Sequence, residues 1–164
     1  MIETGAARAA LHESLELYQA ERNPAAATAW LDLGIAAAIH GDLYSAATAY
    51  EAALAMGREL RDEVVVYRAL YNLGELARNR RKYEQAHALH EESLRLAERY
   101  GDTRNRALAL ASLGRLAWMQ GDYKQAAALN RDSLHFWRHR RDQGGIALSL
   151  EGLAWVASAR GQVR

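Results

Sequence analysis

The hexapeptide Asn72-Leu73-Gly74-Glu75-Leu76-Ala77 recurs forty residues later as Ser112-Leu113-Gly114-Arg115-Leu116-Ala117, and forty residues earlier the chain reads Asp32-Leu33-Gly34-Ile35-Ala36-Ala37. A glycine in the interior of a helix costs about 0.5–1 kcal/mol relative to alanine. Three glycines in one register (Gly34, Gly74 and Gly114) therefore indicate that a second helix passes too close to leave room for a side chain. The spacing predicts an array of helical repeats, which is usually a binding surface.

The composition favours helices and gives no sign of a charged partner. Of the 164 residues, 50% are hydrophobic and 25% are charged, as in an ordinary globular domain. There is one proline (Pro24), and there is one phenylalanine, so sheets are disfavoured. The net charge of +1 gives no electrostatic reason to expect nucleic acid or an anionic membrane as the partner. The chain has no cysteine and shows no signal peptide at residues 1–5, which fits a cytoplasmic location.

Hydrophobic periodicity and turn residues predict about eight helices. Most of the expected breaks contain glycine, as at Gly41-Asp42, Gly101-Asp102 and Gly121-Asp122. We also expect Gly57 to end a helix, with a further, looser boundary near Arg61-Asp62, and Asp142-Gln143-Gly144-Gly145 to form a break. The predicted helices are residues 6–20, 24–40, 44–56 or beyond, 58–79, 83–100, 104–120, 123–140 and 146–160.

Small residues also recur on the second helix of each expected pair. Ala46, Ala86 and Ala126 share one repeat position, and we expect them to be the close-packing partners of the three glycines. No pair buries its faces alone, so neighbouring pairs must stack. The prediction is one repeat domain over residues 1–164, and its terminal half-units indicate a piece of a larger protein. The expected units are 1–22 (partial), 23–62, 63–102, 103–142 and 143–164 (partial).

The repeat pattern resembles the tetratricopeptide repeat, with a period of forty residues in place of about 34. The resemblance implies an all-α fold, namely a right-handed superhelical solenoid of antiparallel helix pairs. It also implies a non-catalytic scaffold that binds proteins or peptides. The three matching patterns are Trp30…Leu33-Gly34…Ala46…Tyr50…Ala53, Leu70…Leu73-Gly74…Tyr83…Ala86…Ser93 and Leu110…Leu113-Gly114…Tyr123…Ala126…Ser133.

Some phrases of the sequence resemble a more specific family. Tyr83-Glu84-Gln85-Ala86 and His90-Glu91-Glu92-Ser93-Leu94 are similar to the helical sensor region of large bacterial transcription regulators. Those are the LuxR-type and signal-transduction ATPase proteins, such as the maltose regulator. This resemblance implies a sensing segment for signal transduction and transcription regulation. The sequence contains neither a nucleotide-binding loop of the Gly-x-x-x-x-Gly-Lys-Ser/Thr type nor a separate helix-turn-helix.

In a tetratricopeptide superhelix the first helix of each pair lines a concave groove. The resemblance therefore implies that eight side chains of this sequence line such a groove. Among them Arg78 and Arg115 are suited to a carboxylate or phosphate. Tyr71, Trp118 and Trp155 are suited to stacking on a ring or an apolar side chain. The alternative is that these residues only solvate a groove or touch neighbouring helices. The groove hypothesis comprises Arg68, Tyr71, Glu75, Arg78, Asn79, Arg115, Trp118 and Trp155.

No other pattern in the sequence indicates chemistry. The basic runs at residues 78–82 and 138–141 fall at expected helix ends, where cations interact favourably with the helix dipole. The pair His87 and His90 lacks a third metal ligand, as does the pair His135 and His139, so we expect no metal, no cofactor and no catalysis. The partner is expected to be a protein, a peptide or a small effector. The alternative function is self-association through apolar end faces that include Leu150 and Trp155.

Overall fold

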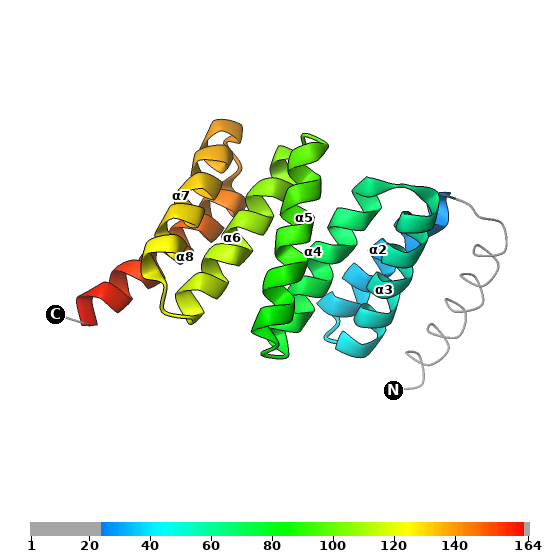
Figure 1. Ribbon diagram of the computed structural model, residues 1–164, viewed down its shortest axis with the longest axis horizontal. Helices are drawn as coiled ribbons and strands as arrows, with labels where there is room; N and C mark the ends of the chain where they lie inside the picture. The colour runs from blue at the N-terminus through cyan, green and yellow to red at the C-terminus, as the bar shows by residue number, and fades with distance from the viewer. Residues whose placement is uncertain (1–23, 163–164) are drawn as a thin grey trace. The chain divides into compact units, whose positions relative to one another are not determined.

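The computed structural model describes residues 24–162, and within that range it consists of helices without strands (Figure 1). The predicted helix at residues 6–20 and the partial unit 1–22 lie outside the described residues. The helices are α2 (Pro24–Ile39), α3 (Leu43–Leu60), α4 (Glu63–Asn79), α5 (Tyr83–Arg99), α6 (Thr103–Met119), α7 (Tyr123–Arg140) and α8 (Gln143–Gln162). The all-α prediction is confirmed. The chain divides into two compact units, residues 1–69 and 70–164, which are described separately.

Consecutive helices are joined by short turns that share one conformation. The residue before each helix-starting cap has a positive φ, and glycine fills that position at three of the turns. Arginine fills it at the other three, Arg61, Arg81 and Arg141. At most turns an aspartate follows, and its side chain accepts a hydrogen bond from the backbone N–H three residues later, as Asp122 does from Gln125 at 2.9 Å. The turn at Arg81-Lys82 differs from the rest in that Lys82 makes no side-chain cap.

Two expected helix breaks are wrong. α3 continues through Gly57 to Leu60, and the boundary lies at Arg61-Asp62. A Cβ atom at Gly57 would lie 3.1 Å from the side chain of Val66, so this glycine allows a close approach and does not end the helix. Likewise, α8 starts at Gln143 and contains Gly145, where a Cβ atom would overlap the indole of Trp137. Both glycines are packing positions, and glycine at such positions looks the same in sequence as glycine in a turn.

In the first unit, α2 and α3 form an antiparallel pair. A Cβ atom at Gly34 would overlap the ring of Tyr50, so the two helices touch where the glycine leaves room. Ala46 and Ala53 of α3 are fully buried. Burial raises the pKa of the Tyr50 hydroxyl to about 12, so this side chain stays neutral at physiological pH.

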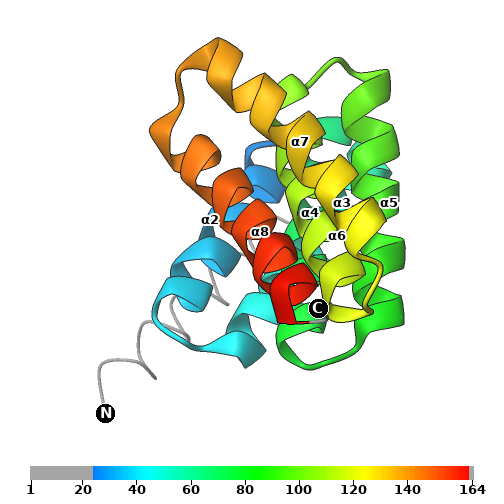
Figure 2. The ribbon, with the colours of Figure 1, turned by 90° about the vertical axis from the view of Figure 1, so that its left-hand side faces the viewer.

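In the second unit, α6 packs against α5, α7 and α8, and α8 lies beside both α6 and α7 (Figure 2). Small residues make this packing close: Ala86 is fully buried beside Ala77 and the larger Leu116, and Ala126 lies in a second cluster with Ala117 and Val156. None of the helices in the described range is long and apolar enough to span a membrane.

Candidate functional site

The two Leu-Gly glycines of the second unit, Gly74 and Gly114, each lie under a polar side chain of the following helix. A Cβ atom at Gly74 would lie 2.6 Å from the His90 ring, and one at Gly114 would lie 2.5 Å from Nδ2 of Asn130. Ala126 approaches Gly114 only through its carbonyl oxygen, which would lie 3.4 Å from the added Cβ atom. Ala86 is fully buried. The residue sixteen positions after each glycine is therefore the side chain that covers it.

His90 belongs to a charged cluster centred on Glu75 of α4. Oε2 of Glu75 pairs with Arg78 at 2.9 Å, and Oε1 accepts a hydrogen bond from the Ser112 hydroxyl of α6 at 2.8 Å. Nε2 of His90 lies 3.3 Å from the same Oε1. The two atoms are not aligned as a hydrogen bond. Three helices thus meet at one carboxylate.

The contacts of Glu75 determine its charge. Burial alone would raise the pKa of this carboxyl group, but the interactions with His90 and Arg78 outweigh burial and lower the pKa from 4.5 to about 2. The neighbouring Tyr71 has its pKa raised by burial and by the charge of Glu75. Near neutral pH the cluster therefore presents an ionised carboxylate beside a neutral phenol.

A second cluster joins α6 to α8. The guanidinium of Arg115 lies over the Trp155 ring, 5.0 Å from its centroid. Trp118 packs on Trp155 with ring centroids 5.4 Å apart and donates its indole N–H to the Trp155 carbonyl oxygen at 3.2 Å. Both tryptophans are half-buried, so each contributes to packing and keeps part of its ring exposed.

Six of the eight predicted groove residues therefore lie in these two clusters of the second unit. Asn79 is exposed at the end of α4, and Arg68 is half-buried in the first unit. Sequence reasoning missed His90 and Ser112. Position sixteen after the glycine was the available signal for His90, and for Ser112 it was adjacency to the Leu113-Gly114 pair.

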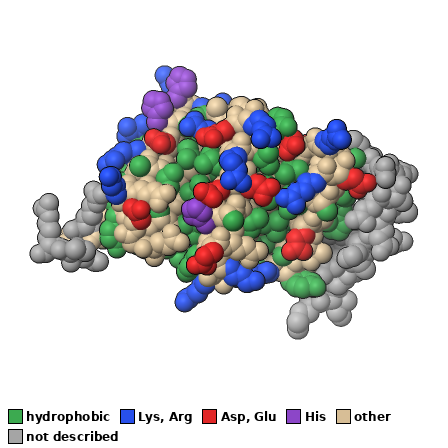
Figure 3. Space-filling view, viewed as in Figure 1, with side chains coloured by type: hydrophobic (Ala, Val, Ile, Leu, Met, Phe, Trp, Pro, Cys, Tyr) green, Lys and Arg blue, Asp and Glu red, His purple; other side chains and the backbone are tan. Residues whose placement is uncertain are grey.

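The described surface shows no other concentration of chemistry. On the face shown in Figure 3, basic and acidic side chains alternate, and histidines gather near the end of α7. Across residues 24–162, no three histidine, aspartate or glutamate side chains are grouped so as to hold a metal ion.

Comparison with known proteins supports a tetratricopeptide repeat domain. Residues 65–139 match the family model of the tetratricopeptide repeat, a non-catalytic scaffold family that generally mediates protein–protein interaction. The search of curated proteins found no match. Among solved structures, the chain is similar to the nearly identical TPR-like repeats of a Podosopora anserina protein named for the kinesin light chain. The identity is 17% and the TM-score 0.67, with 93% of this chain and 76% of that chain covered, which shows a shared tetratricopeptide-like fold.

Proposed function

We propose that the chain is a non-catalytic scaffold that binds an extended peptide of a partner protein on the surface formed by α4, α6 and α8 of the second unit. One observation carries this proposal: Arg115, Trp118 and Trp155 form a half-buried aromatic and cationic cluster, and Arg115 also interacts electrostatically with Tyr71, the neighbour of the ionised Glu75. Aromatic rings with polar groups at their edges suit the side chains and backbone of a peptide.

The two arginines differ in whether they already form an ion pair, and this difference indicates which one would contact a ligand. Arg78 is already paired with Glu75 at 2.9 Å. Arg115 makes no ion pair within the described part of the chain, where its guanidinium lies over the Trp155 ring. Binding at Arg115 therefore breaks no existing salt bridge, whereas binding at Arg78 competes with Glu75. We assign Arg115 as the main polar contact and Arg78 and Tyr71 as supporting contacts, with Arg68 and Asn79 as peripheral predictions.

Selection from a random peptide library tests this function. Peptides enriched on the full chain are expected to lose at least about fivefold in affinity with Arg115→Ala, the scale of one charge-assisted contact, and to keep it with Lys124→Ala. Lys124 is an exposed cation at the start of α7, outside both clusters. Equal affinity of the wild type and Arg115→Ala for every enriched peptide would contradict the proposal. A double change with Trp118→Ala is unsuitable, because Trp118 also packs on the Ala117–Val156 cluster.

We further propose that the chain is the sensing segment of a larger bacterial transcription regulator, acts in the cytoplasm and responds to a protein or a small effector. This proposal rests on the resemblance of residues 83–86 and 90–94 to such regulators. It predicts that the gene encodes a nucleotide-binding loop upstream of this segment or a helix-turn-helix downstream. A complete gene that encodes neither would remove the basis of this proposal.

Self-association is the second candidate function. It is favoured by Leu150 of α8, a large apolar side chain that is 45% exposed. Light scattering at increasing protein concentration is expected to show an oligomer if this face associates, and Leu150→Glu should then restore the monomer. A monomer at all concentrations would exclude this alternative.

A further inference from the structure

Helix α8 presents an exposed apolar face centred on Leu150. Leu150 is 45% exposed, and three exposed alanines lie on the same side of the helix, because they follow or precede it at helical spacing. The face consists of Ala147, Leu150, Ala154 and Ala157. A helix that carries apolar residues on two opposite sides usually has both sides covered.

The repeat register shows what the same face does on α6, where α7 packs on it. The counterparts forty residues earlier are Ala107, Leu110, Gly114 and Ala117, and all four are buried. Leu110 is only 7% exposed, and Gly114 lies directly under Asn130 of α7. The carbonyl oxygen of Ala107 accepts a hydrogen bond from the Ser133 hydroxyl of α7 at 2.8 Å. The exposed face of α8 therefore has the pattern of a face on which a helix packs.

The opposite side of α8 already packs on α7. A Cβ atom at Gly145 would overlap Trp137, and one at Gly152 would overlap Asn130. Between these two contacts, the Ser149 hydroxyl donates a hydrogen bond to the Ser133 hydroxyl at 3.0 Å. Because α7 occupies that side, it is not available to cover the Leu150 face.

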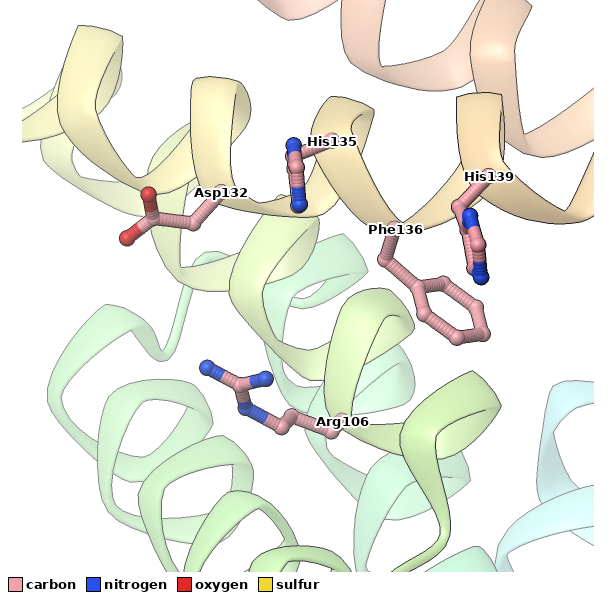
Figure 4. A pocket seen from close by; sticks show the side chains of 5 residues that line it. All are labelled: Arg106, Asp132, His135, Phe136 and His139. Carbon is pink, nitrogen blue, oxygen red and sulfur yellow. The ribbon is translucent and has the colours of Figure 1, made fainter.

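The outer side of α7 has a different character. Figure 4 shows the side chains around an open pocket between α6 and α7, and four of the five are charged or titratable. They are Arg106, Asp132, His135, Phe136 and His139. Such a lining is suited to contact with water, whereas the Leu150 face of α8 contains no charged side chain. Of these two surfaces, the Leu150 face is the one that favours a further helix contact.

The spacing of this face is symmetrical, which suits a second copy of α8. Leu150 and Ala154 lie at equal distances along the chain on either side of Gly152, and so do Ala147 and Ala157. When two identical helices pack antiparallel about a two-fold axis, residues placed symmetrically in this way face each other. Each Leu150 would therefore face the small Ala154 of the other copy, which leaves room for the leucine side chain.

We propose that the protein forms a two-fold dimer in which the Leu150 face packs antiparallel on the same face of a second copy. The proposal rests on self-association, the second candidate function, and specifies its face, partner and symmetry. One helix pair is smaller than a standard protein interface, so the dimer is weak and depends on concentration. Glu151 is exposed beside the face and close to the two-fold axis, so the two like charges approach each other and salt should strengthen the dimer.

Sedimentation equilibrium of the full chain tests the proposal. The wild type is expected to pass from monomer to dimer, and no further, as its concentration rises about a hundredfold. Leu150→Ala and Ala154→Leu should each weaken the dimer at least about tenfold, the first by losing an apolar contact and the second by overpacking, because each change occurs twice in a two-fold dimer. The double variant exchanges the large and the small residue and should restore the affinity to within about threefold. Ala128→Leu on the exposed side of α7 is the matched control and should leave the dimer unchanged.

The possible failures separate this proposal from the others. A monomer at every concentration would overturn both the dimer and self-association. Species larger than a dimer, or a dimer that the double variant does not restore, would overturn this geometry and leave self-association in place. The affinity for a library-selected peptide at the α4, α6 and α8 surface is a separate measurement, so its loss would contradict peptide binding and not the dimer.

Cysteine cross-linking tests the direction of the helix pair, since the chain contains no native cysteine. In the antiparallel pair a thiol at position 147 faces position 157 of the other copy. A short bismaleimide should therefore cross-link a mixture of Ala147→Cys and Ala157→Cys, but neither variant alone, where the two thiols lie about 15 Å apart. Cross-linking of each variant with itself, and not of the mixture, would indicate a parallel pair and would overturn the proposal.

Discussion

The α4–α5 and α6–α7 helix pairs have the same Leu-Gly register but differ in the side chain that covers the glycine. His90 covers Gly74 and lies 3.3 Å from Glu75, which connects the packing contact to a charge. Asn130 covers Gly114, and its Nδ2 donates to the Ala126 carbonyl at 2.8 Å within its own helix. The glycine thus keeps the helices close in both pairs, while the covering residue determines whether the contact is linked to an ionised group on the proposed binding surface.

The largest expected effect comes from filling the space that both pairs share. Gly74→Leu and Gly114→Leu are each expected to lower the free energy of unfolding by up to about 3 kcal/mol, because the added side chain overlaps a buried neighbour. Urea denaturation measures the change. The control is Ala88→Leu on the exposed side of α5, which adds side-chain volume where there is room and should change stability by less than about 0.5 kcal/mol.

The position of Asn130 affects how strongly the two leucine substitutions should destabilise the protein. A Cβ atom at Gly152 of α8 would also overlap Asn130, so this side chain lies between two glycines and has little room to move. Gly114→Leu should therefore be at least as destabilising as Gly74→Leu. Wild-type stability in either variant would contradict the close-packing explanation of the register.

Lowering the pH is expected to weaken the α4–α5 pair, which contains the ionised Glu75, more than the α6–α7 pair. The pKa of Glu75 is lowered in the folded state to about 2, below its ordinary value of 4.5. Its contribution to stability is therefore complete above pH 4.5 and is lost as the pH falls from 4.5 through about 2. We expect this contribution to be on the order of 2 kcal/mol, after allowance for the partial exposure of the carboxylate.

Glu75→Gln tests that contribution, because the variant should be less stable at pH 7 and should lose less stability than the wild type between pH 5 and pH 2. The control is Glu91→Gln on the exposed face of α5. If the stability of the wild type and of Glu75→Gln falls in parallel over this range, Glu75 is not held ionised by its neighbours.

The turns of the two pairs also differ, and this difference predicts a stabilising substitution. The α6–α7 turn is Gly121-Asp122, with Asp122 capping α7, whereas the α4–α5 turn is Arg81-Lys82 without a side-chain cap. Lys82→Asp is expected to raise the free energy of unfolding by about 1 kcal/mol, and Asp122→Ala to lower it by a similar amount. Thermal unfolding of both variants checks the prediction, and a destabilised Lys82→Asp protein would contradict it.

The smallest expected change in stability is at the α6–α8 cluster. Arg115→Ala removes one cation over the Trp155 ring and should cost less than about 1 kcal/mol. Its effect on the binding of library-selected peptides should be larger than its effect on unfolding. If thermal unfolding and binding suffer equally, Arg115 is a structural residue and the proposed binding surface loses its main contact.

The sequence was informative where one residue determines the local structure. Gly41, Gly101 and Gly121 mark turns because their positive φ favours glycine, and the aspartate after each supplies the cap. The same reasoning was wrong at Gly57 and Gly145, since a glycine in a close helix contact carries no local signal that distinguishes it from a turn glycine.

The candidate site was predictable only in part, because it depends on which helices become neighbours. The repeat register placed Tyr71 and Trp155 on the first helices of their pairs. It did not show that Ser112 would donate to Glu75 across 37 residues of sequence or that His90 would be fully buried beside it. Such pairings follow from the stacking of whole helices, so a local pattern cannot reveal them.

The binding of a library-selected peptide to the α4, α6 and α8 surface is the central claim, and the indole N–H resonances of the tryptophans test it most directly. In a proton–nitrogen NMR titration of the full chain, the resonances of Trp118 and Trp155 are expected to shift. That of Trp137, which is buried between α7 and α8 and donates its indole N–H to the Ser133 hydroxyl, should remain in place. Unshifted Trp118 and Trp155 resonances at a saturating peptide concentration would show that the peptide binds elsewhere and would contradict the account.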